Sequence, residues 1–205
     1  MLFVLFSIVA NGAGDPGSGT ITASYNSVSM TEVARSVQAA GSYAQAAVLF
    51  VLANPASGTN TVSISTTSSP FAVIGNAASY TGAGGTVDVS TTNSGTGTSL
   101  STSLTPTASG GWTLLAAKVA NTDPSASTGS TLFGSLNSNQ AFFDSNGTVS
   151  SGSPYSMDLT TSASNRFDVV MAAFGPPSAG GAGGPLTRGG SLTHGALIRG
   201  GRLAA

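Results

Sequence analysis

Three aspartates are the acidic residues that could act together in catalysis. Asp88, Asp158 and Asp168 each lie in a strand-like segment with hydroxyl-bearing neighbours. Glycoside hydrolysis needs two carboxylates about 5 to 10 Å apart in a groove, usually with aromatic rings that stack on the sugar. Trp112 is the only tryptophan in the chain, and no motif joins the three aspartates. A secreted hydrolase is therefore a disfavoured alternative.

The only histidine, His194, stands in a glycine-rich stretch near the C-terminus. Nucleophilic catalysis by Ser, His and Asp requires a histidine held rigidly within hydrogen-bonding distance of the nucleophile. A flexible setting does not provide this. One histidine and no cysteine are also too few ligands for a zinc site. We therefore expect no enzyme activity, no cofactor and no metal.

The stretch DSNG at 144–147 offers oxygen ligands for calcium through Asp144 and Asn146. The same four residues are typical of a hairpin turn, which is the favoured interpretation. Asn146 also begins a formal glycosylation sequon with Thr148, which is most simply a chance match.

The composition is nearly uncharged. Charged residues make up 6% of the 205 residues, against about 25% in an ordinary soluble domain. Ser, Thr, Gly, Ala and Asn take their place, so the surface should carry short neutral side chains. Such a surface suits extracellular or assembled structural proteins better than cytosolic enzymes. Without cysteine, stability must come from packing, sheet pairing or assembly.

Short β-branched and aromatic runs, separated by Gly, Pro, Asn and Ser, predict an all-β fold. Turns are expected at 25–28, 54–60, 80–85, 92–99, 109–111 and 144–154. Candidate strands are 2–10, 20–25, 28–37, 43–53, 59–66, 71–80, 85–91, 99–105, 112–120, 131–143, 154–161 and 167–174. This number of short strands fits a two-sheet antiparallel sandwich.

Three of these runs are apolar almost throughout. The runs AAVLFVLA and FDVVMAAF should be covered on both faces, by the opposing sheet and by loops or a neighbouring subunit. The opening MLFVLFSIVA is favoured as a buried strand over a cleaved signal, because no basic residue precedes it. It is too short to span a membrane as a helix.

The C-terminal segment has a different character. Residues 1–175 carry a net charge of −4, and the rest carries +3 with no acidic residue. We expect a sandwich domain at 1–175, a Pro/Gly linker at 176–185 and an extended basic arm at 186–205. The arm would dock on a partner through Leu186, Arg188, Leu192, His194, Leu197, Arg199, Arg202 and Leu203.

Nucleic acid and carbohydrate are two other kinds of candidate partner for this chain. Three arginines without aromatic residues give too few phosphate contacts for nucleic-acid binding. A carbohydrate could bind at loops 80–98 and 144–154, with Tyr80 and Trp112 as candidate contacts. Single aromatic residues at strand ends are more often buried in a core, however.

The strings SYNSVSMTEVA, VLFVLANPASGTNTVSIS, AVIGNAASYTGAGGTVD, FFDSNG and SSGSPYSMDLTTSASNRFDVVMAAF resemble jelly-roll, lectin-like surface modules of phage virions. The resemblance covers about 1–175 and contains no catalytic motif. It implies a jelly-roll fold and a place on the surface of an extracellular particle. Such modules typically have one more strand before the strand that MLFVLF resembles, and a neighbouring subunit could fill that edge.

The sequence thus predicts a non-enzymatic virion structural protein. The favoured role is a capsid decoration or cement protein, anchored to the major capsid protein or another virion protein by its arm. A dimer or trimer is expected, because an apolar and poorly charged rim can bury against copies of itself. The alternative is a carbohydrate-binding module of a head or tail fibre that recognises a surface glycan. Neither role involves nucleic acid or a membrane.

Overall fold

The computed structural model describes residues 1–11, 16, 19–40, 43–67, 70–126, 128–136, 139–175 and 187–192. These residues form antiparallel strands and no helix, which confirms the all-β sandwich. It follows that none of them belongs to a helix long and apolar enough to cross a membrane. The jelly-roll strand order stays a prediction.

The strands form three sheets. Sheet A has the order β14 (Thr187–Leu192), β7 (Ala72–Thr81), β1 (Leu2–Asn11), β5 (Tyr43–Leu52) and β4 (Thr31–Ala40). Sheet B has the order β3 (Val28–Ser29), β2 (Ile21–Tyr25) and β6 (Val62–Thr66). Sheet C has the order β10 (Ser125–Ala126), β13 (Tyr155–Phe174), β9 (Trp112–Val119), β12 (Gln140–Asp144) and β11 (Thr131–Leu136), and β8 (Val87–Leu104) also pairs with β13.

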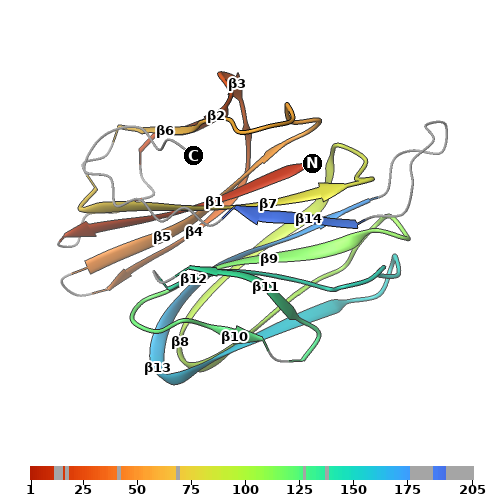
Figure 1. Ribbon diagram of the computed structural model, residues 1–205. Helices are drawn as coiled ribbons and strands as arrows, with labels where there is room; N and C mark the ends of the chain where they lie inside the picture. The colour runs from red at the N-terminus through yellow and green to blue at the C-terminus, as the bar shows by residue number, and fades with distance from the viewer. Residues whose placement is uncertain are drawn as a thin grey trace.

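The three sheets stack as layers, with sheet A in the middle (Figure 1). Alternate residues of its strands serve two separate cores, because successive side chains of a strand point to opposite faces. Phe3 and Leu5 pack in the core toward sheet C, while Val4 and Phe6 pack in the core toward sheet B. Sheet A is therefore covered on both faces.

Strand β1 is the centre of this arrangement. It pairs with β5 on one side and β7 on the other, and Met1–Ile8 are all buried. An apolar strand of this kind is expected where both faces are covered. The prediction of a buried strand at 2–10 is confirmed.

The apolar runs of β5 and β13 are also covered on both faces, as predicted. The second face of each strand is covered by other strands of the same chain, and not by the expected loops or neighbouring subunit. Sheet B covers the outer side of β5, and a third core covers the outer side of β13. That third core contains Met157 and Leu159 from the first half of β13 itself, together with Leu104 from the end of β8.

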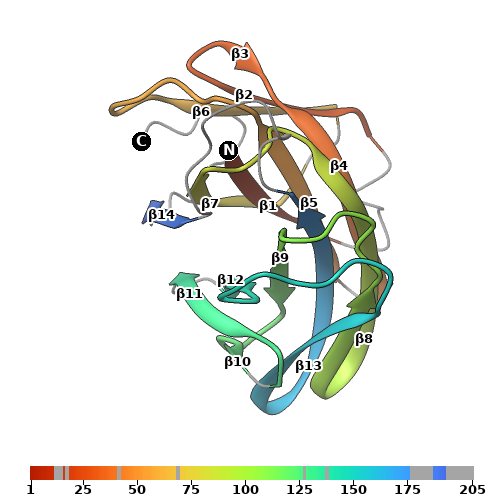
Figure 2. The same ribbon diagram turned by 90° about the vertical axis from the view of Figure 1, so that its right-hand side faces the viewer.

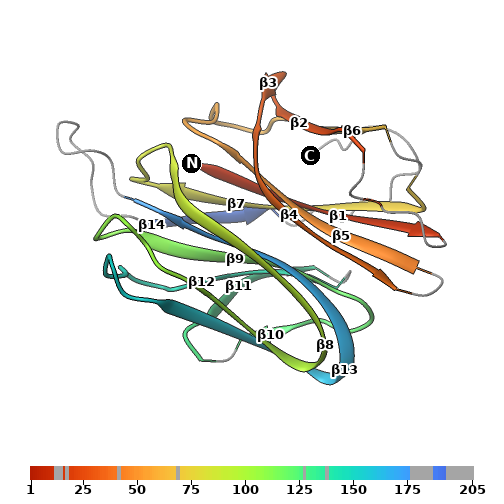
Figure 3. The same cartoon turned by 180° about the vertical axis from the view of Figure 1, so that it is seen from behind.

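Strands β8 and β13 form a long, strongly curved antiparallel pair within sheet C (Figures 2 and 3). The predicted turn at 92–99 is wrong, because Val87–Leu104 is a single strand. The predicted strands 154–161 and 167–174 are likewise one strand, with a register shift between Thr160 and Asn165. The Ser, Thr and Gly residues of 92–99 resemble a loop because this edge strand is largely solvent-facing.

Two predicted strands are divided in the structure. The segment 28–37 is broken at Met30 into β3 and the start of β4, and 131–143 becomes β11 and β12. Asn139, directly before β12, has a φ of 60°. Asparagine tolerates this left-handed conformation better than most residues, so it can end one strand and start the next.

Candidate functional site

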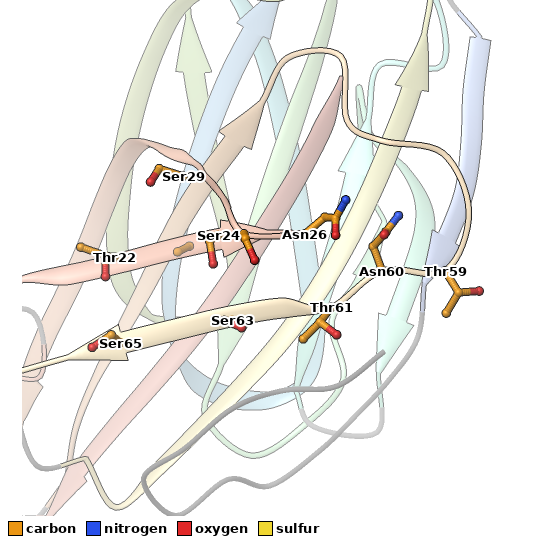
Figure 4. A pocket seen from close by; sticks show the side chains of 11 residues that line it. Thr22, Ser24, Asn26, Ser29, Thr59, Asn60, Thr61, Ser63 and Ser65 are labelled. Atoms are coloured by element: carbon orange, nitrogen blue, oxygen red, sulfur yellow. The ribbon is translucent and has the colours of Figure 1, made fainter.

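A hydroxyl-lined groove with a volume of about 800 Å³ lies on sheet B (Figure 4). Its side chains come from β2, β3, β6 and the adjoining turns. Paired strands bring hydroxyls side by side, since Thr22 lies opposite Ser65 and Ser24 lies opposite Ser63. The lining residues are Thr22, Ala23, Ser24, Asn26, Ser27, Ser29, Thr59, Asn60, Thr61, Ser63 and Ser65.

The turn beside this groove is fixed by Tyr25 and Asn60. The Tyr25 hydroxyl donates to the Ala56 carbonyl at 3.1 Å, and the Asn60 amide donates to the Tyr25 hydroxyl at 3.1 Å. Asn60 also donates to the Ser57 and Gly58 carbonyls at 3.2 Å. The groove therefore has one rigid end.

The chemistry of this groove is uniform. Every lining side chain is uncharged, and hydroxyls and amides both donate and accept hydrogen bonds. Such a surface can bind neutral polyhydroxylated molecules and has no group to activate a nucleophile. The groove was not predicted from the sequence. The alternation in TITASY and TVSIS could have signalled it, since it places small polar residues on one face.

Tyr80 and Trp112 do not fit the predicted glycan contact. Tyr80 is 1% exposed and Trp112 is 9% exposed, and both belong to the core between sheets A and C. Their rings pack on each other at a centroid distance of 6.0 Å, and Tyr80 also packs on Phe174 at 4.7 Å. Neither ring offers a face on which a sugar could stack.

A buried polar cluster lies between sheets A and C. Asp168 of β13 is fully buried and accepts hydrogen bonds from Ser36 Oγ at 3.0 Å and Gln45 Nε2 at 2.7 Å. Ser36 and Gln45 belong to β4 and β5, so these bonds join the two sheets. On sheet C, Lys118 lies directly opposite Asp168 on the neighbouring strand and is also buried.

Burial governs the ionisation of this pair. Loss of solvation raises the pKa of Asp168 to about 6, although the bonds from Gln45 and Ser36 and the charges of Arg166 and Lys118 oppose the rise. Loss of solvation also lowers the pKa of Lys118 to about 8, with Asp168 opposing this change. Perturbed groups of this kind are candidates for function, and they also occur in purely structural networks.

The same layer contains polar atoms that lack hydrogen-bond partners within the structure. They are Ser7 Oγ, both amide atoms of Asn76, and Gln140 Oε1. The Gln140 amide nitrogen does donate to the Ile74 carbonyl at 3.0 Å. Buried polar atoms are usually hydrogen-bonded, so these four atoms are exceptions among the polar groups between sheets A and C.

The aspartates singled out for hydrolysis do not share a groove. Asp168 points between sheets A and C. Asp88 lies next to Val87, which pairs with Phe174 at the C-terminal end of β13. Phe174 is about 20 Å from Asp168 along this strand. Met157 and Leu159, on either side of Asp158, belong to the third core, so the Asp158 side chain points away from that core.

Asp88 has a local structural role. Its carboxylate accepts bonds from the backbone and hydroxyl of Thr107 and from the Ala108 backbone at 3.1 Å. Burial alone would raise the pKa of Asp88, but these hydrogen bonds lower it. The carboxylate thus fixes the turn that follows β8.

The DSNG turn is confirmed as a turn. Asn146 has a φ of 47°, and its backbone N–H donates to Asp144 Oδ1 at 3.0 Å. Asp144 is fully buried and accepts a bond from the Tyr80 hydroxyl at 3.0 Å. No group of three or more potential metal-ligating His, Cys, Asp or Glu side chains occurs in the described ranges.

The arm is described only in part. Residues 187–192 form β14, which pairs antiparallel with β7 at the edge of sheet A. Arg188 lies opposite Tyr80 in this ladder and Leu192 lies opposite Ala77. The other residues predicted to bind a partner, and the linker 176–185, lie outside the described residues: Leu186, His194, Leu197, Arg199, Arg202 and Leu203.

Comparison of this chain with protein-family models, with curated proteins and with solved structures gave no match. The resemblance to virion surface modules therefore stays a prediction. The features that bear on function are the groove on sheet B, the nearly uncharged composition and the strand β14.

Proposed function

We propose that this chain is a non-enzymatic structural protein of a phage virion, a decoration or cement protein on the outer surface of the capsid. The sandwich forms the body, and residues 186–205 attach it to the major capsid protein or another virion protein. Attachment of this kind needs a segment that adds to a sheet edge or a groove of another chain.

One observation carries this proposal. Residues 187–192 follow β13 in the chain and pair as an edge strand with β7 of the same chain, not with a partner. The sequence TRGGSL forms this strand despite two glycines, and its ability to add to a sheet edge supports the proposed attachment. Two of the three arginines of the segment, Arg199 and Arg202, follow this strand in the sequence.

The body supports the same role. Six per cent charged residues and a hydroxyl-rich face leave little electrostatic repulsion between copies. Close packing of many copies on a particle is therefore less costly than for an ordinary soluble domain. A local dimer or trimer on the particle is part of the proposal.

The proposal is tested by adding purified chain to phage particles that lack it and counting copies by cryo-electron microscopy. The full chain should occupy regular sites, and a chain ending at Gly175 should leave them empty. Full occupancy by the shortened chain would refute attachment through the arm. A variant with Arg199→Ala and Arg202→Ala is the matched control for charge, with reduced occupancy expected.

A second candidate function is carbohydrate binding, and the groove on sheet B favours it. About 800 Å³ of neutral hydroxyl and amide lining is complementary to a short glycan. A glycan array should then show binding that falls when Ser24 and Ser63, which face each other across β2 and β6, are replaced by valine. The control is Thr96→Val on β8, outside the groove. An array without binding would remove this candidate.

A further inference from the structure

Strand β7 lies between β1 and the edge strand β14 in sheet A. Both its faces are largely buried, and β1 pairs with one of its edges. The other edge pairs with β14 alone. If β14 were absent, an apolar strand would present a row of free backbone N–H and C=O groups to solvent, which is a strong template for another strand.

The pairing of β14 with β7 is short. Its ladder with β7 has four register positions and is interrupted between Arg188 and Ser191. Thr81 and Thr187 add a contact between their exposed hydroxyl groups. Within the described sheets, β14 pairs with β7 and with no other strand.

The chain that joins β14 to the body is long for the gap it spans. Gly175 accepts a hydrogen bond from Gly84 N at 2.9 Å, so the end of β13 lies close to the loop that follows β7. Strand β14 begins opposite Thr81, three residues before Gly84. The eleven intervening residues, PPSAGGAGGPL, could reach about 36 Å when extended.

We propose that residues 187–192 are exchanged between copies, so that the arm of one chain adds to the β7 edge of a second copy. This inference rests on the proposed structural role and specifies what part of the arm binds. The remaining arm residues, 193–205, are left for the shell. Each copy would then be linked to its neighbour as well as to the particle.

The energetics favour exchange when copies are crowded. The same ladder forms within a chain or between chains, so contact energies cancel and only concentration decides. A short linker gives its own strand an effective concentration in the millimolar range. A neighbour on a particle surface reaches a similar concentration, whereas a dilute solution does not. Exchange should therefore increase with protein concentration.

Single-cysteine variants test this directly, because the natural chain has no cysteine. Thr81 and Thr187 are in register and their hydroxyls touch, so cysteines at these positions can form a disulfide. Full-length Thr81→Cys, labelled with ¹⁵N, is mixed with unlabelled Thr187→Cys and oxidised at several concentrations. Intact mass spectrometry then measures the mixed disulfide dimer.

We expect the mixed dimer to rise at least tenfold between micromolar and millimolar protein. The double variant should form an internal disulfide at micromolar concentration and mixed dimers at millimolar concentration. The matched control pairs Thr187→Cys with Thr22→Cys, an exposed threonine on β2, and should give only background dimer.

Exchange is refuted if the mixed dimer stays at the control level at millimolar protein while the double variant closes internally. It is also refuted if the double variant forms neither an internal disulfide nor a disulfide-linked dimer, since β14 would then not pair with β7 of either copy. Either result leaves attachment to a shell open. Conversely, a shortened chain that still decorates particles would refute the proposed function without bearing on exchange.

Discussion

Strands β1 and β14 lie in the same sheet but are held very differently. Strand β1 pairs with β5 at ten positions and with β7 at eight, and its side chains enter two cores. Strand β14 pairs with one neighbour at four positions. Because β14 has far fewer paired positions than β1, we expect the arm to open more readily than the body unfolds.

The largest effect should come from weakening β1. Phe3 is fully buried and packs on the rings of Tyr80 and Phe174, at centroid distances of 6.0 and 5.1 Å. Phe3→Ala removes these contacts and leaves a cavity, so we expect the free energy of unfolding to fall by about 3 to 5 kcal/mol. Chemical denaturation followed by tryptophan fluorescence measures the loss.

The control for this change is Val28→Ala on β3, where the side chain is 53% exposed. Its effect should stay within about 0.5 kcal/mol. Equal losses for the two variants would mean that β1 is not the centre of the body.

A smaller effect, which depends on pH, should come from Asp168. Its folded pKa of about 6 is above the ordinary value of 3.8, so the folded protein binds an extra proton between these values. The contribution of Asp168 to stability is therefore present below about pH 4 and lost as the pH rises through 6. The full difference is on the order of 3 kcal/mol.

Asp168→Asn should remove this pH dependence. We expect the stability of the natural chain relative to the variant to fall as the pH rises from 4 to 7, measured by urea denaturation at each pH. Ser36→Ala is the control, because it removes one hydrogen bond and keeps the carboxyl group. A difference that is constant with pH would show that Asp168 does not titrate in this range.

The smallest effect should come from breaking β14. Ser191→Pro disturbs the ladder opposite Ala78. Because β14 contributes only a short edge pairing, we expect the unfolding free energy to change by less than about 1 kcal/mol. A loss comparable to that of Phe3→Ala would show that β14 is an integral part of the body.

The sequence predicted much of the body and little of its layering. Apolar runs such as that of β5 showed which strands are buried on both faces. The apolar runs do not show which segments cover the second face of each strand. That cover depends on the pairing of sheet B and on the third core, to which the end of β8 and the first half of β13 contribute. The continuous β8 was missed because Gly95 and Gly97 suggest a turn, while pairing with β13 keeps the chain extended.

The candidate sites were predicted less well. Tyr80 and Trp112 were predicted as glycan contacts because they are aromatic, but both are buried in the core between sheets A and C. The groove consists of common Ser and Thr residues that become a site only when β2 and β6 pair. Asp168 and Lys118 are fifty residues apart, and only strand pairing shows that they are neighbours.

Hydrogen exchange at the two strands tests the separation of body and arm most directly. The account predicts that amides of β1 exchange only through global unfolding, and that amides of β14 exchange at least a hundredfold faster in the same sample. Mass spectrometry of peptides that cover Leu2–Asn11 and Thr187–Leu192 measures both rates. Equal protection of the two strands would contradict the account.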